Sequence, residues 1–498
     1  MLNILVFGFI CLVLCWILTI CFPPISFPNN IPTIPFYSVF IPQYYNIDQV
    51  QFYNLYVREK LEKYGAVKFY FGSRWNILVS RPEFLNNIFK NEDTFAKSGN
   101  QQKIPYSVLA AYTGDNVISA HGVNWQKYRK PIKDGLQHFD IGILLKNAMK
   151  FCELIKEDMR PFKYHCNFKI IPYIQRLTLD NICRVGLGFE FGAIDEDNNS
   201  LHRQLIQIKK QIFDPFYLNF PMFDRLPLPS RLLAFQNVEN FRSSLVDKVQ
   251  KQLIKTYKFE QANTSGSALV RAYNNGELTY KQLTDNIVIL LVAGHENPQL
   301  FISNLIYLLG KYHDTWQVDI RNEILNNEEN NLSELPLLNS FLYECLRYYP
   351  PLSVIINRKT TKRCMLGPGI VVPKDTYVGY HNYSTCHDSN FWGHTADIFD
   401  PTRWGKDIET INKAWKTTKN NCILNTFHGG KRACLGEKLV FVSTRIIIAE
   451  FLSSFEWKLS PLWVEQMTHA GPLCPKDLAL DIRVRDTSMQ IQKLNKYL

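Results

Sequence analysis

The chain has 498 residues, of which 46% are hydrophobic and 13% aromatic, as in a packed globular protein with a sizeable core. Its formal net charge of +11 would suit nucleic acid, anionic lipid or an acidic protein as a partner. No Lys/Arg run and no repeated aromatic–basic motif is present, so the sequence argues against nucleic acid.

Residues 1–22 contain no charged side chain, and they match the ~20 apolar residues of a membrane-spanning helix. A cleaved signal peptide would need a basic start and a cleavage site of small residues, and neither is present. Five prolines follow between positions 23 and 35. We therefore expect a transmembrane anchor over 1–22, a proline-rich hinge over 23–42 and one catalytic domain over 43–498.

The positive-inside rule says little about which side of the membrane the catalytic domain lies on, because the first Lys or Arg after the apolar segment is Arg58. The twelve cysteines are scattered, with no C-x-x-C pair, which is typical of free thiols in a reducing compartment. The cysteine pattern therefore predicts a cytosolic body.

In the body, "AVKFYFG" (66–72) and "NILVS" (76–80) read as two strands, and a helix should begin near Pro82. Helical patterns dominate 120–350, short β segments follow, and a last helix is expected at about 435–455 before a β-rich tail. The predicted fold is mainly α, with a smaller β portion built from both ends of the chain.

One helix should open with a capping box at Thr279 and Gln282 and run to about Leu309. Near its middle, "GHENP" places Gly294 and Pro298 where they cost roughly 1 and 3 kcal/mol. Pro298 has no N–H, so the carbonyl of Gly294 loses its helical partner. A cost of this size inside a buried helix indicates a functional reason.

The stretch "FHGGKRACLGEKL" (427–439) places Cys434 between glycines, just ahead of an apolar helical run. A helix N-terminus stabilises a thiolate, the form of cysteine that binds metal. Gly430 and Gly436 would let the backbone approach something flat, and Phe427 could shield the sulfur from water. A tight loop around an inert buried cysteine is the alternative.

Three other motifs place arginines near possible partners. "ECLR" sets Glu344 and Arg347 on one face of an apolar helix, where Arg403 of "FDPTRW" could bind the same carboxylate. "WQKYR" offers Trp125 and Arg129, and Arg358 follows a "YPP" turn; these arginines suit carboxylate groups. Taken singly, each motif also fits ordinary surface charge.

Together, in this order, the motifs resemble the cytochrome P450 family over the whole chain. The matching residues are Phe427, Gly430, Arg432, Cys434 and Gly436 in F-x-x-G-x-R-x-C-x-G, Glu344 and Arg347 in E-x-x-R, Pro401, Arg403 and Trp404 in P-x-R-W, and Trp125 and Arg129 in W-x-x-x-R.

The resemblance implies the P450 fold and a heme b whose iron takes the Cys434 thiolate as its ligand. It places Arg129, Arg358 and Arg432 near the heme propionates, and it makes Glu344, Arg347 and Arg403 a structural lock of the core.

It further implies electrons from NADPH through a separate flavoprotein reductase, whose acidic face would suit Lys431, Lys438 and Arg445. The expected location is the endoplasmic reticulum membrane, single-pass, with membrane lipid as a partner and the catalytic domain in the cytosol.

In this family the long central helix crosses the face of the heme where oxygen reacts. Gly294 would make room there, and Glu296 would supply a proton route. The family pattern is A/G-G-x-D/E-T, whereas this chain reads "AGHEN", so Asn297 replaces the threonine that relays protons. The change favours one-electron oxidation over oxygen insertion. His295 is expected to be a structural hydrogen-bond partner and not a ligand.

Segments such as "TFAKSGNQQKIPYS" and "TDNIVILLVAGHENPQL" resemble, within that family, yeast sporulation oxidases that couple two N-formyltyrosine molecules into bisformyl-dityrosine for the spore wall. The alternatives are a monooxygenase that hydroxylates a lipid, sterol or xenobiotic, and a non-catalytic heme-binding protein. Substrate contacts are expected, by analogy, in 100–120, 210–225 and 354–357.

Overall fold

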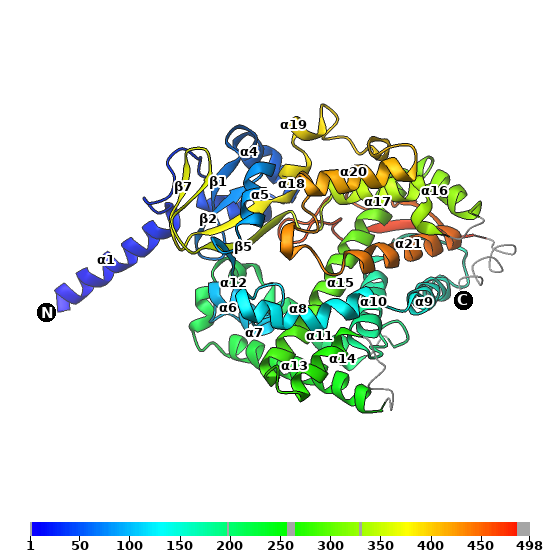
Figure 1. The fold of residues 1–498 in the computed structure, drawn as a ribbon, viewed down its shortest axis with the longest axis horizontal. Coiled ribbons are helices and arrows are strands. Elements are labelled where there is room, and N and C mark those ends of the chain that lie inside the picture. Colours follow the sequence, from blue (N-terminus) through cyan, green and yellow to red (C-terminus); the bar gives the residue numbers. More distant parts are fainter. Residues whose placement is uncertain (1, 197–198, 256–263, 328–330, 486–498) are drawn as a thin grey trace.

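A computed structural model describes residues 2–196, 199–255, 264–327 and 331–485, so the end of the predicted catalytic domain, 486–498, lies outside the described residues. Helices form most of the body, and the strands gather mainly at one side of it (Figure 1). The longer helices are α8 (Gly122–Gln137), α9 (Ile141–Asp158), α10 (Ile171–Asn181), α11 (Ser200–Ile212), α13 (Pro229–Lys255), α14 (Ser265–Asn274), α15 (Tyr280–Lys311), α16 (Trp316–Leu325), α17 (Pro336–Tyr348), α20 (Ile408–Asn420) and α21 (Glu437–Ser454).

The largest sheet joins distant parts of the chain, in the strand order β1-β2-β8-β5-β3. Its strands are β1 (Ala66–Tyr70), β2 (Trp75–Val79), β3 (Phe95–Lys97), β5 (Val354–Thr360) and β8 (Tyr377–His381). The two predicted strands are present as β1 and β2, which pair antiparallel, and β2–β8 is parallel. A register shift lies between Ile356 and Arg358 of β5.

Smaller β elements complete the fold. A three-stranded sheet has the order β4-β10-β9, with β4 (Tyr164–Lys169), β9 (Phe455–Leu459) and β10 (Ala479–Val484), and β6 (Cys364–Gly367) pairs with β7 (Ile370–Val372). The mainly α fold with β structure from both ends is therefore as predicted.

The central helix α15 begins with the predicted capping box, because Thr279 and Gln282 each bond the other's backbone N–H. It stays helical through Gly294 and Pro298 and ends at Lys311, two residues beyond the predicted Leu309. The missing N–H at Pro298 is thus accommodated inside a continuous helix.

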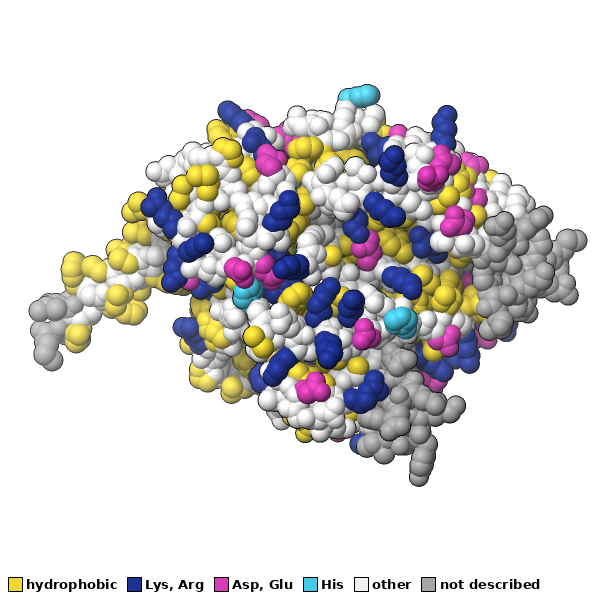
Figure 2. Space-filling model, in the orientation of Figure 1, with side chains coloured by type: hydrophobic (Ala, Val, Ile, Leu, Met, Phe, Trp, Pro, Cys, Tyr) yellow, Lys and Arg dark blue, Asp and Glu magenta, His cyan; other side chains and the backbone are white. Residues whose placement is uncertain are grey.

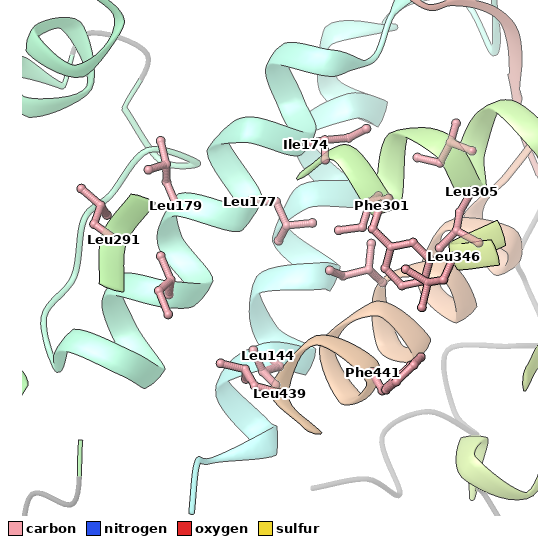
Figure 3. Packing of buried hydrophobic residues seen from close by; sticks show 14 of the residues in the cluster. Leu144, Ile174, Leu177, Leu179, Leu291, Phe301, Leu305, Leu346, Leu439 and Phe441 are labelled. Atoms are coloured by element: carbon pink, nitrogen blue, oxygen red, sulfur yellow. The ribbon is translucent and has the colours of Figure 1, made fainter. Parts of the chain in front are cut away.

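The main hydrophobic core packs the helices around α15. Figure 3 shows Leu144 of α9 beside Leu439 of α21, and Leu346 of α17 beside Phe301 of α15. All four side chains are buried, and all four also line the cavity described below. The core therefore supplies an apolar wall for a candidate site.

The N-terminal helix α1 (Leu2–Cys21) projects from the body with large apolar side chains exposed (Figures 1 and 2). In the part of the chain that the structure describes, no helix combines the length and the apolar character needed to cross a membrane. The predicted transmembrane helix over 1–22 is therefore unsupported.

Part of the predicted hinge, 23–42, packs on the body. Ile31 and Ile34 are buried, and the backbone N–H of Ile34 donates to the Lys68 carbonyl at 2.9 Å. This segment therefore extends the sheet edge at β1 and does not stand free as a spacer.

Candidate functional site

A cavity of about 320 Å³ lies in the interior of the helical body. Its wall includes residues of α8, α9, α10, α15, α17 and α21, the start of β5 and the loop that precedes α21. Most of the wall is apolar, with a few polar groups, which is the usual character of a ligand site.

Cys434 lies at one wall of this cavity, its side chain facing the open space. The loop that carries it turns through η7 (Gly430–Arg432), and the Cys434 N–H donates to the Phe427 carbonyl at 2.9 Å. Burial raises the pKa of the Cys434 thiol, while the backbone N–H groups of Gly436 and Glu437 act in the opposite direction. The predicted support from the helix N-terminus is present, and a bound cation would complete the deprotonation.

The glycines of this loop serve different purposes. Gly436 lines the cavity, and a Cβ there would meet nothing nearer than the Cys434 sulfur at 3.9 Å. Gly430 has φ +63°, and a Cβ there would lie 3.0 Å from the Phe89 carbonyl oxygen. The prediction that Gly430 admits something flat is therefore wrong, because this glycine admits the backbone that ends α5 (Pro82–Lys90). Phe427 lines the cavity near the sulfur, as predicted.

Basic side chains gather at a second wall. The Arg432 guanidinium lies 3.9 Å from the ring centre of Trp125, and that of Arg129 lies 5.3 Å from it. All three residues line the cavity. Arg358 is buried behind this wall, where its Nη1 donates to the Phe95 carbonyl at 3.2 Å. The structure thus brings together the arginines that the sequence placed far apart.

Two residues of this cluster were missed by the sequence reasoning. Lys97 is buried at the cavity wall, and in the described part of the chain its ammonium forms no ion pair. Glu92 pairs with Arg432 and lies 3.9 Å from Arg358 Nη1. Glu92 belongs to no segment that the sequence analysis quoted, and Lys97 lies in "TFAKSGNQQKIPYS" but was given no role there, so only the folded chain shows what these two residues do.

The residues present fit a flat dianionic group. Nη1 and Nη2 of Arg432 and Nε of Arg358 are buried without a hydrogen-bond partner. Among the described residues, Glu92 is the one carboxylate that pairs with Arg358 and Arg432, and neither Arg129 nor Lys97 has an acidic partner, so negative charge is lacking at this wall. Heme brings two propionates, and Cys434 offers its iron a soft ligand on the same cavity.

On α15, Gly294 and Asn297 line the cavity. A Cβ on Gly294 would lie 2.2 Å from Cγ1 of Ile182, the first residue of η3 (Ile182–Leu187). The space at Gly294 is therefore filled by Ile182, which corrects the expectation that the glycine leaves it open. The Asn297 carboxamide faces the cavity, with no hydrogen-bond partner among the described residues.

Glu296 is not part of the cavity wall. Its Oε1 lies 3.1 Å from Lys209 Nζ of α11 and 3.9 Å from His295 Nε2. His295 is fully buried, its Nδ1 is 2.7 Å from the Leu291 carbonyl, and burial lowers its pKa to about 4. His295 is thus a neutral structural partner, as predicted, while the proton route through Glu296 stays a prediction.

The predicted lock is present in full. Glu344 and Arg347 are completely buried, and Glu344 accepts from Arg347 at 2.7 and 2.9 Å and from Arg403 Nε at 3.0 Å. Trp404 Nε1 and the Asp400 N–H donate to the same carboxylate at 3.1 and 2.9 Å. This network joins α17 to the segment before α20.

Of the segments expected to contact substrate, two reach the cavity. Val117 and Ile118 come from 100–120, and Ile355 and Asn357 come from the region of 354–357. None of the cavity-lining residues comes from 210–225.

Comparisons with known proteins agree with this geometry. The family model described as Cytochrome P450 matches residues 35–478. Cytochrome P450-DIT2 of Saccharomyces cerevisiae is 58% identical over 92% of this chain and 94% of its own length. The cytochrome P450 monooxygenase xanG of Aspergillus fumigatus is 31% identical over 92% of this chain and 87% of its own. The heme domain of cytochrome P450DA, 17% identical, superposes with a TM-score of 0.72 over 93% of this chain and 98% of that one, which bears on the fold alone.

Proposed function

The chain belongs to the cytochrome P450 family and is a heme-thiolate oxidase, and we propose that it couples two N-formyltyrosine molecules into bisformyl-dityrosine. The observation that carries the proposal is the 58% identity to the yeast relative over almost its whole length, together with the segments that resemble dityrosine-forming oxidases. A role in maturation of the spore wall is part of the same proposal.

When bound, heme held by Cys434 supplies the oxidising chemistry, using O2 and electrons from a reductase. Arg129 and Arg432, whose guanidinium groups both pack on the Trp125 ring, would bind the carboxylate edge of the cofactor. Ile182 and Phe301 are buried at the cavity wall, where they exclude water and form an apolar surface for an aromatic ring.

The overall reaction balances with NADPH as the proposed electron source. Two phenolic hydrogens leave two substrate molecules, and one carbon–carbon bond forms between the rings. The two hydrogen atoms supply two electrons and two protons, and NADPH with one proton supplies the other two electrons and the other two protons. Together they reduce one O2 to two molecules of water. The product therefore has twice the substrate mass less two hydrogen atoms, and it carries no oxygen atom from O2.

The side chain at position 297 supports coupling over hydroxylation. A threonine hydroxyl both donates and accepts a hydrogen bond and so can pass a proton on, whereas an amide N–H holds its proton. Asn297 can therefore hold a polar group of the substrate in the cavity, but it is a poor relay. Glu296 lies toward Lys209, away from the cavity wall.

We expect Asn297→Thr to raise the ratio of hydroxylated to coupled product by roughly 10-fold or more, because a positioned proton-transfer group contributes about 10²-fold or more. Product masses measure the ratio. Asn297→Ala is the matched control, since it removes the amide without adding a hydroxyl and should not favour hydroxylation. An unchanged ratio in Asn297→Thr would show that this position does not set the outcome.

The proposed function is tested with purified protein, a flavoprotein reductase, NADPH, ¹⁸O2 and N-formyltyrosine. We expect dityrosine fluorescence, the mass given above and no label in the product. N-formylphenylalanine is the control, because it lacks the phenolic hydroxyl and should not couple. A labelled product heavier than the substrate by one oxygen atom would instead establish a monooxygenase. A rate of NADPH consumption that does not change when substrate is added would indicate a non-catalytic heme-binding protein.

For the reductase, Lys431 and Lys438 are exposed beside the Cys434 loop, as an acidic partner would require. Arg445, predicted with them, is instead half-buried and donates from Nε to Asn339 at 2.8 Å, so it is not available. Lys127, Lys130 and Lys133 of α8 are exposed as well, and many Lys and Arg side chains are visible on the face shown in Figure 2.

We also propose attachment to the endoplasmic reticulum membrane, with the catalytic domain on the cytosolic side. The uncharged sequence of residues 1–22 and the exposed apolar side chains of α1 support attachment through this helix. The free cysteines support the cytosolic side.

A further inference from the structure

Glu92 lies in the turn between α5 and β3, where it meets three other elements that carry basic groups. It pairs with Arg432 of η7, lies 3.9 Å from Arg358 Nη1 of β5, and lies 3.7 Å from His121 Nδ1 at the start of α8. The same α8 carries Trp125. One carboxylate thus connects the three elements that form the basic wall of the cavity.

Glu92 binds Arg432 through Nε of the guanidinium and not through its two Nη atoms. Nε of Arg432 donates to Glu92, while Nη1 and Nη2 are buried without a hydrogen-bond partner. The guanidinium carbon Cζ lies 3.9 Å from the centre of the Trp125 ring. The Arg432 side chain is therefore held by Glu92 at Nε and by the packing on Trp125, and the two Nη donors suited to a bidentate carboxylate are left free.

The charges around Glu92 explain why a carboxylate is needed there. Burial and the neighbouring arginines lower the pKa of Lys97, and burial lowers those of Arg358 and Arg432; Glu92 acts in the opposite direction on all three. Within the described residues, Glu92 is the one acidic side chain that pairs with this cluster. Without it, several buried cations would face one another unscreened.

We propose that Glu92 is a positioning residue for the cofactor: it holds Arg432 through Nε, so that both Nη donors stay aligned for a heme propionate that Glu92 itself does not touch. Glu92 thereby ties cofactor retention to the alignment of α8, β5 and η7. The inference rests on the heme assignment, which the absorption spectrum of the wild-type holoenzyme tests separately.

The test uses Glu92→Gln in the full-length holoenzyme, because glutamine keeps the size and one acceptor oxygen but removes the charge. Heme loss is followed by transfer to excess apomyoglobin. We expect transfer roughly 10-fold faster than in wild type, since the hydrogen bond from Arg432 is no longer strengthened by a negative charge. The reduction potential of the heme should shift to a more positive value, because a nearby negative charge is removed.

A double-mutant cycle shows whether Glu92 acts through Arg432. In an Arg432→Lys background, Glu92→Gln should speed heme transfer little further, because the side chain that Glu92 positions is gone. Independent, additive effects would contradict a positioning role.

Asp224→Asn is the matched control. Asp224 binds Arg231 Nε at 2.6 Å in a buried pair, and neither residue lines the cavity. This change should lower stability to unfolding while the heme potential stays at the wild-type value. If Glu92→Gln leaves both the transfer rate and the potential unchanged, or alters them only as much as Asp224→Asn does, the proposal is overturned.

Discussion

Cys434→Ser should abolish formation of coupled product, with a loss of roughly 10³-fold or more, equivalent to at least about 4 kcal/mol of transition-state stabilisation. Serine keeps the shape of the side chain at the cavity wall, but its hydroxyl remains protonated and is a hard, poor ligand for heme iron. The measurement is product formation per folded molecule, with heme content determined on the same sample.

Cys364→Ser is the control for this change, because Cys364 is a free thiol in β6 and does not line the cavity. It should leave both heme content and product formation close to wild type. Substantial activity in Cys434→Ser would mean that another group holds the iron.

Glu344→Gln should destabilise the protein by about 3–5 kcal/mol, a large fraction of the ~5–15 kcal/mol that separates folded from unfolded proteins. Glu344 accepts five hydrogen bonds, from Arg347, Arg403, Trp404 and the Asp400 backbone. An amide offers one acceptor oxygen in place of two, so the fully buried Arg347 is left with uncompensated charge. Urea unfolding followed by circular dichroism measures the loss.

Glu62→Gln provides the comparison, since it also removes a Glu–Arg pair, with Arg58 at 2.8 Å, but one that is about one-third exposed. Exposed pairs contribute about 1 kcal/mol or less. Equal losses in the two variants would show that burial does not give the Glu344 network its importance.

The sequence predicted those parts of the site that depend on short-range patterns. The Cys434 loop, the Glu344–Arg347 pair and the capping box at Thr279 are each contained within a few residues, so spacing alone describes them. The strands near both ends of the chain were also predictable, because short runs rich in β-branched and aromatic residues lie between turn residues there.

Features set by long-range packing could not be predicted in this way. A side chain at position 294 would collide with Ile182, and one at position 430 would crowd the Phe89 backbone. Each of these neighbours is more than 100 residues away in the chain. Glu92 and Lys97 show no pattern in the sequence, because their importance comes from three other elements that meet around them. The sequence showed that Asn297 stands where the family has threonine, but it did not show that this side chain lies at the cavity wall.

The central claim is that the sulfur of residue 434 binds heme iron as a thiolate. The most direct measurement is the absorption spectrum of the purified wild-type protein after reduction and exposure to carbon monoxide. The account predicts the strongly red-shifted Soret band that thiolate ligation produces. A Soret band at the position given by a histidine or a neutral thiol ligand, in fully heme-loaded and folded protein, would contradict it.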